Sequence, residues 1–280
     1  MIHRLSTVHL ILHAVLVFYV FSGCVYSQDR GAAEEKALHH TKDGFQNPYV
    51  EKKNRGFFKY MKMRYFSNEK FADYEANAHK VPRVETDIAA IQHPMDALQV
   101  TWIGHATILI QYNGVNILTD PMFSDRASPV SFLGPKRYNP PALQIEDLPP
   151  IDYIVISHSH FDHLDQNTVQ QIGSRAKWLV PLGLQKWFVR AGVNAENIME
   201  FDWWDVRQFA KTTITATPAQ HWSARSLWDR NKTLWASWIL QIDDKTIWYS
   251  GDTGYNPCLL YTSDAADDNR VVEVSGGGGW

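Results

Sequence analysis

The sequence has too few cysteines for a disulfide framework or a thiolate zinc site, since Cys24 and Cys258 are the only two among 280 residues. It also lacks an excess of positive charge, because 27 lysines and arginines against 30 acidic residues give a net charge of −3. This balance argues against a dedicated nucleic acid binder, and no nucleic acid partner is expected. Any metal must therefore be held mainly by the 12 histidines and by carboxylates.

A run of about 20 apolar residues, the length that a membrane-spanning helix needs, is also missing. The N-terminal apolar stretch extends only from Leu10 to Phe21, after the weakly positive start at His3 and Arg4. This pattern predicts a secretory signal over residues 1–27. An uncleaved anchor is one alternative, because no formally charged side chain lies between Leu5 and Gln28. A lipoprotein is another, because Phe21-Ser-Gly-Cys24 loosely resembles a lipoprotein box. We therefore expect a secreted or extracytoplasmic protein, membrane-associated if the apolar segment is retained.

Apolar and aromatic side chains are abundant. Hydrophobic residues make up 45% of the chain and aromatic residues 13%, with 11 tryptophans. This composition favours a folded protein with a buried core over a disordered one. Residues 28–96 are polar and mixed, which is typical of a linker with a peripheral helical segment. From Leu98 onward predicted strands and helices alternate, so residues 97–257 are expected to form a layered α/β domain.

The predicted elements of this domain follow from apolar runs and turn signals. Asn113-Gly114 predicts a two-residue hairpin turn, because both positions need a positive φ. Strands are expected over residues 98–104, 105–112, 115–119, 153–157, 178–180, 197–201, 212–217, 233–242 and 246–250, and helices over 165–172 and 182–191.

Candidate metal ligands cluster in the segment His158-Ser-His160-Phe-Asp162-His163, which follows the predicted buried strand over residues 153–157. Residues two apart share a face of an extended chain, so His158 and His160 can present two imidazoles to one cation. Asp162 and His163 come where the chain must turn, and they can face a second cation nearby. Imidazole and carboxylate ligands suit zinc or another borderline divalent ion.

Two further candidate ligands follow other predicted strands. His221 comes shortly after the strand over residues 212–217, and Asp252 lies between Gly251 and Gly254, which permit a tight turn. Loops that leave a sheet are where active-site residues concentrate. His105 lies in a predicted strand corner, and we expect it to be a structural residue.

Taken together, these motifs resemble the N-acylphosphatidylethanolamine-hydrolysing phospholipase D group of the metallo-β-lactamase fold. The resemblance covers about residues 95–256. Besides His-x-His-x-Asp-His, it rests on segments that occur in chain order: Thr119-Asp120-Pro121, Ser128-Pro129, Gly134-Pro135-Lys136-Arg137-Tyr138, Asp202-Trp203-Trp204, Pro218-Ala219-Gln220-His221-Trp222 and Gly251-Asp252-Thr253-Gly254-Tyr255.

The resemblance implies an αββα sandwich with two zinc ions at one sheet edge. His158, His160 and His221 would hold one zinc, and Asp162 and His163 would hold the other. Asp252 would bridge the two, which makes Asp162 and Asp252 the catalytic carboxylates. The implied reaction is the attack of metal-activated water on a phospholipid phosphodiester, giving N-acylethanolamine and phosphatidic acid. Because related lactonases share several of these motifs, a lactonase or another metallo-hydrolase is the alternative, as is an inactive metal-binding fragment.

Four other residues are weaker candidates. Asp120 ends a predicted strand and can hydrogen-bond a ligand imidazole from outside the ligand set, with a plain turn carboxylate as the alternative. Lys136 and Arg137 are candidate contacts for a substrate phosphate, or else ordinary loop charges. Trp222 is a candidate wall for an acyl chain, since apolar chains need apolar walls. A phospholipid substrate or a membrane surface is the expected partner.

The end of the sequence departs from the family pattern. In that family, more strands, helices and a late histidine follow the bridging aspartate, whereas only 28 residues follow Asp252 here and none is histidine. We therefore expect the second half of the sandwich to be incomplete and the second zinc site to be one ligand short. Residues 258–280 are expected to be non-native or disordered, with no core pattern beyond a Val271-Val272 pair.

Overall fold

The computed structural model describes residues 38–49, Lys62, Phe66, and residues 82–95, 97–255 and 271–274. The chain forms two compact units, residues 1–42 and 43–280. The predicted signal over residues 1–27 lies outside the described residues, as does most of the predicted peripheral helical segment. In the part of the chain that is described, no helix has the length and hydrophobicity of a membrane span.

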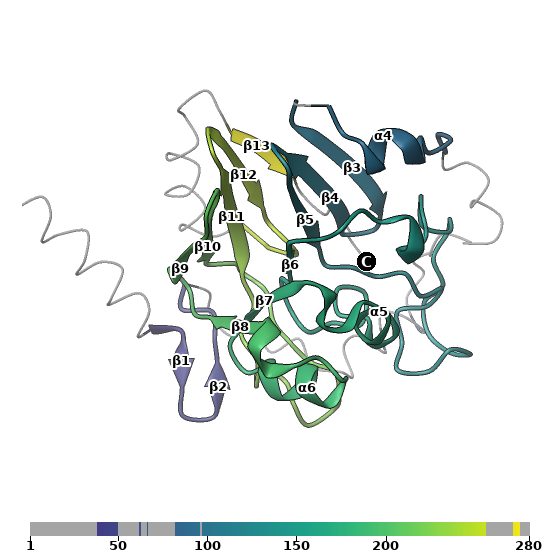
Figure 1. Ribbon diagram of the computed structural model, residues 1–280. Coiled ribbons are helices and arrows are strands. Elements are labelled where there is room, and N and C mark those ends of the chain that lie inside the picture. Colours follow the sequence, from purple (N-terminus) through teal and green to yellow (C-terminus); the bar gives the residue numbers. More distant parts are fainter. Residues whose placement is uncertain are drawn as a thin grey trace, which may run out of the picture. The chain divides into compact units, whose positions relative to one another are not determined.

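Strand β1 (His40–Thr41) belongs to the first unit, and strand β2 (Gly44–Phe45) belongs to the second. The second unit is built on two larger sheets (Figure 1). The first of these has six strands in the order β3-β4-β5-β6-β7-β8. Their bounds are Gln99–Gly104, Thr107–Tyr112, Val115–Thr119, Tyr153–Val155, Lys177–Pro181 and Ile198–Phe201. Strands β3 to β5 pair antiparallel, and β5 to β8 pair parallel. The predicted hairpin turn joins β4 to β5, with φ of 49° at Asn113 and 78° at Gly114.

The second large sheet has five strands in the order β13-β12-β11-β10-β9. Strands β9 to β13 span Val206–Gln208, Thr212–Thr217, Ser237–Ile242, Lys245–Tyr249 and Val271–Val274. All pairs are antiparallel except β12 with β13, which is parallel. Strand β9 was not predicted, because its residues are exposed and show no apolar alternation. Strand β13 lies in the tail, where we expected little structure.

Two layers of core result from the alternation of side chains along the strands. Ile108 and Ile110 of β4 point toward the five-stranded sheet and pack with Trp238 of β11. Leu109, between them, points the other way, into a core shared with α5 (Gln166–Ile172) and α6 (Gln185–Arg190). Helix α4 (Ile88–Gln92) contributes Ile91 to that second core. The described residues thus form successive layers of helices, sheet and sheet, which is the mixed α/β architecture that the sequence predicted.

Trp238 connects the two sheets and is completely buried. Its indole Nε1 donates to Ile156 O at 3.1 Å, and its ring meets Phe201 edge-on at 5.1 Å between centroids. Trp238→Ala is therefore expected to lower the free energy of unfolding by about 3–5 kcal/mol. Urea denaturation measures the loss. Trp228→Ala, at a tryptophan that is 86% exposed, is the matched control and should change stability little. Equal losses in the two variants would contradict this account of the core.

Candidate metal centre

The candidate ligands gather at one edge of the two sheets because of strand direction. Strands β5 and β6 are parallel, so the loops that carry Asp120 and His158 leave the sheet on the same side. Strands β10 and β12 both run antiparallel to β11, so His221 and Asp252 also follow strand ends that lie on one side. Gln220 and Gly254 join the two loops through a short β-bridge. Gly251 has a φ of 56°, and a Cβ there would collide with Ser157.

Three imidazoles converge in the first donor group. His158 Nε2 lies 2.8 Å from His160 Nδ1, and His221 Nε2 lies 3.2 Å from that same nitrogen. The Ser157 hydroxyl is 2.9 Å from His158 Nδ1 and donates its proton to Asp120. It therefore accepts from Nδ1–H of His158, which leaves the lone pair on Nε2 facing the other two histidines.

Carboxylates join the second donor group. His163 Nε2 lies 3.6 Å from Asp162 Oδ2 and 3.4 Å from Asp252 Oδ1. The other oxygen of Asp252, Oδ2, lies 3.9 Å from His221 Nε2 in the first group. Asp252 thus presents one oxygen to each group, which is the placement that a bridging ligand requires.

Burial sets the ionisation of the first group. It lowers the pKa of His160 to about 4 and that of His221 to about 4, and it holds the pKa of His158 well below its ordinary value. These imidazoles are therefore neutral at neutral pH, which is the form that binds metals. Burial also works against a charged His163, but the carboxylates of Asp120, Asp252 and Asp162 together outweigh it and raise the pKa of His163 well above its ordinary value.

The residues fit a bound divalent metal. A tetrahedral shell with metal–nitrogen bonds of about 2.0–2.1 Å separates neighbouring nitrogens by about 3.4 Å, near the spacing of the three imidazoles. A cation among the three nitrogens would accept a lone pair from each neutral imidazole. In the second group, His163 Nε2 is buried and makes no hydrogen bond with any described residue. A metal between His163 and the two carboxylates would use that nitrogen.

Asp120 holds His163 from behind. Its Oδ2 accepts from His163 Nδ1 at 2.7 Å and from the Ser157 hydroxyl at 2.5 Å, while Oδ1 accepts from the Ser157 backbone N–H at 2.6 Å. The Tyr249 hydroxyl of β12 donates to the same carboxylate. With the proton of His163 fixed on Nδ1, its Nε2 is directed at Asp162 and Asp252.

Two residues at the centre were missed by sequence reasoning. His105, interpreted as structural, places Nε2 3.0 Å from Asp162 Oδ2 and forms a possible ligand group with Asp162 and His163. Arg225 Nη1 donates to the backbone oxygens of Ser159 and Leu164, at 2.9 and 2.7 Å, and so fixes both ends of the ligand loop. The Gly104-His105-Ala106 corner was a usable signal for His105, whereas nothing local to Arg225 indicated its contacts.

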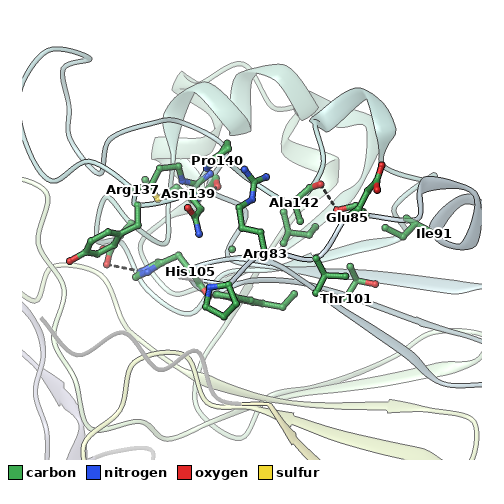
Figure 2. Close-up of a pocket in the computed structure, with 18 of the residues that line it drawn as sticks. Arg83, Glu85, Ile91, Thr101, His105, Arg137, Asn139, Pro140 and Ala142 are labelled. Atoms are coloured by element: carbon green, nitrogen blue, oxygen red, sulfur yellow. Dashed lines mark hydrogen bonds and ion pairs between the residues drawn. The ribbon is translucent and has the colours of Figure 1, made fainter. Parts of the chain in front are cut away.

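The candidate substrate residues divide between two places. Lys136 and Arg137 line a cavity of about 730 Å³ that reaches His105 and Asp162 (Figure 2). Trp222 does not line that cavity. Its ring lies edge-on to His160, 4.2 Å between centroids, and the guanidinium of Arg230 lies 4.5 Å above it. Trp222 therefore covers the first donor group.

Comparison with known proteins gives the context for this centre. A family model described as a beta-lactamase superfamily domain matches residues 115–267, more than half of the chain. The chain is 43% identical over 173 residues to the N-acyl-phosphatidylethanolamine-hydrolyzing phospholipase D 1 of Caenorhabditis elegans, a match that covers 58% of this chain and 49% of that protein. It is 41% identical over 162 residues to the mitochondrial N-acyl-phosphatidylethanolamine-hydrolyzing phospholipase D of Saccharomyces cerevisiae, covering 55% of this chain and 34% of that protein.

Among solved structures, a possible metal-dependent hydrolase from Veillonella parvula matches with a TM-score of 0.49 and 20% identity, covering 62% of this chain and 71% of that chain. The two curated relatives are longer than the region that matches. The chain spans half or less of the length of each.

Replacement of His158 or His160 by alanine is expected to remove metal from the first donor group, because each change deletes one of three converging nitrogens. Elemental analysis of protein purified in the presence of zinc measures the loss. His93→Ala, at an exposed histidine away from the centre, is the matched control and should keep the wild-type metal content. Full metal retention in both ligand variants would contradict the assignment.

Asp120→Asn tests the hydrogen bond that orients His163. The amide keeps the shape of the side chain but removes the charge that favours Nδ1–H of His163, so affinity for the second metal should fall about 10–100-fold. Competition with a chromophoric chelator measures the affinity, and a parallel thermal melt checks folding. Asp244→Asn, at an exposed carboxylate, serves as the control. An unchanged affinity in folded Asp120→Asn would contradict this role.

Proposed function

Because this chain belongs to the β-lactamase superfamily, we propose that its metal centre is that of a zinc-dependent hydrolase. The proposed substrate is N-acylphosphatidylethanolamine, a phosphodiester that water would cleave to N-acylethanolamine and phosphatidic acid. The names of relatives that are 43% and 41% identical support this substrate. Their greater length makes the activity of the whole protein part of the proposal.

The observation that carries the proposal is the pair of donor groups on either side of Asp252. One group offers three imidazole nitrogens, and the other offers an imidazole with carboxylates. Imidazole and carboxylate together favour zinc over magnesium or calcium, which prefer all-oxygen sites. Hydrolysis at such a centre needs no serine or cysteine nucleophile.

Each residue has a role that follows from its contacts. A metal pair, when bound, supplies Lewis acidity and lowers the pKa of water to near neutrality. Asp252 lies between the two donor groups, with one carboxylate oxygen near each. Asp162, which belongs to the second group, lines the cavity. Asp120 fixes the proton of His163 on Nδ1. Arg137 and Lys136 place positive charge along the cavity, where it would offset the charge of a phosphodiester.

A membrane surface is the proposed partner, because a phospholipid substrate resides there. Several large apolar side chains near the centre are exposed, including Trp102 at 62% and Trp222 at 38%. Aromatic rings of this kind suit the interface between water and lipid. An extracytoplasmic or membrane-associated location, proposed from the N-terminal apolar stretch, is consistent with such a substrate.

The function is tested with zinc-loaded protein, N-acylphosphatidylethanolamine and water labelled with ¹⁸O. Mass spectrometry should find N-acylethanolamine without the label and phosphatidic acid with it, since water attacks phosphorus and the alcohol leaves. Asp252→Asn should lower the rate by more than about 100-fold, because even partners outside the ligand set cost 10–100-fold. Asp244→Asn should retain the wild-type rate.

Three other outcomes would overturn the assignment. Cleavage of an uncharged lactone without cleavage of the phospholipid would favour the lactonase alternative. Metal binding with no turnover of either substrate would favour a non-catalytic metal-binding role. Hydrolysis that survives Asp252→Asn would place the reaction elsewhere.

A further inference from the structure

The cavity beside the metal centre lies between helix α4, strand β3 and the loop over residues 135–142. Its volume of about 730 Å³ falls in the range of sites for organic ligands. Asp162 belongs both to its wall and to the second donor group, and His105, also in the wall, contacts Asp162, so the cavity reaches the centre. Figure 2 shows His105 and Arg137 toward one end and Glu85 and Ile91 toward the other.

Apolar side chains line much of this cavity. Ile91 of α4 and Ile103 of β3 form part of its wall and are almost fully buried, and Met122 lies near its inner end. The exposed ring of Trp102 extends the wall outward. The apolar surface of this wall that still faces water belongs mainly to Val84, which is 90% exposed, and to Trp102, which is 62% exposed. A hydrocarbon chain would cover that surface, which is favourable in proportion to the area covered.

At the end of the cavity that His105 lines, Arg137 has N–H groups without hydrogen-bond partners. Its Nη2 donates to Met122 O at 3.2 Å and lies close to Gly104, the residue before His105. Its Nε and Nη1 are buried and have no hydrogen-bond partner among the described residues. Buried N–H groups without acceptors are unfavourable, because the hydrogen bonds to water that they lost on burial are not replaced.

The charge of Arg137 is also poorly balanced. Burial lowers the pKa of its guanidinium, while Asp125 and Asp165 act from a distance to raise it. No carboxylate of the described residues forms an ion pair with it. An anionic group is the ligand that a guanidinium in this position would accept, since two parallel N–H donors match phosphate or carboxylate oxygens.

We propose that this cavity binds an amphiphile with one phosphate-class anionic group on the guanidinium of Arg137 and its hydrocarbon chain along Val84 and Trp102. This inference rests on the proposed function and deepens it, because it states how the lipid would be oriented. The anion would lie at the end shared with His105 and Asp162, and the chain would extend away from the metal centre. Arg137 would then determine specificity for charged lipids over neutral ones.

The test compares three probes on zinc-loaded protein of matched metal content: inorganic phosphate, hexadecyl phosphate and hexadecanol. Titration calorimetry gives the affinities. Hexadecyl phosphate should bind best, because it alone uses both ends of the cavity. Arg137→Gln should weaken hexadecyl phosphate binding by about tenfold or more, the value of a hydrogen bond to a charged group. Lys186→Gln, at an exposed lysine that does not line the cavity, is the matched control and should leave the affinity unchanged.

A second variant tests the apolar part. Ala142→Phe puts a ring into the cavity, so it should weaken hexadecyl phosphate but leave inorganic phosphate unchanged. Arg137→Lys covers the case in which Arg137→Gln does not fold. It keeps the charge but loses the paired donors, and an intermediate affinity is expected.

The opposite results would overturn the inference. These are equal affinity for hexadecyl phosphate in wild type and both Arg137 variants, or equal affinity for inorganic and hexadecyl phosphate in the wild type. Failure here is distinguishable from failure of the proposed function. Phospholipid hydrolysis with no effect of Arg137 on binding would reject the cavity site alone. Binding as expected without hydrolysis would reject the function alone.

Discussion

The buried carboxylate of Asp120 is the interaction on which the rest of the centre depends. Its donors come from three parts of the chain: Ser157 after β6, His163 in the ligand loop, and Tyr249 of β12 in the other sheet. A buried charge is tolerated only when it is well hydrogen-bonded, so none of these donors is dispensable. With the bond from the Ser157 hydroxyl there are four such contacts, and they also join the two sheets and orient a ligand histidine. The Asp120 carboxylate therefore contributes both to the stability of the sandwich and to the geometry of the metal centre.

The two donor groups differ in charge, and this difference has a physical consequence. In the first group, burial keeps three imidazoles neutral, so they bind a cation without first losing protons. In the second, burial opposes ionisation of Asp252, but His163 and His221 outweigh it and hold the pKa of that carboxyl below its ordinary value. A cation bound there would meet negative charge already in place and would replace a proton on His163. Asp252 belongs to both groups, so occupancy of one alters the electrostatic environment of the other.

The sequence predicted most of what depends on local spacing. The strands over residues 115–119 and 212–217 have the predicted bounds, and His158 and His160 lie together because alternate residues share a face. Contacts between distant segments could not be predicted in this way. His105 lies 57 residues from Asp162 and Arg225 lies 66 residues from Ser159, and no pattern around either histidine or arginine specifies its partner. Strand β9 was not predicted for a different reason. Its residues are exposed at the edge of a sheet, so they show no apolar alternation.

The turn between β3 and β4 relates the metal centre to the cavity. His105 has a φ of 52°, a conformation that costs a residue other than glycine about 1–3 kcal/mol unless its surroundings enforce it. Here Trp102 Nε1 donates to His105 O at 2.8 Å, and the Thr107 hydroxyl donates to Asp120 O at 2.9 Å, so the turn is held from both sides. Trp102 belongs to the cavity wall and Asp120 to the support of His163. His105 lies between them and places its Nε2 3.0 Å from Asp162 Oδ2, so this one turn contributes both to the wall of the cavity and to the surroundings of the second donor group.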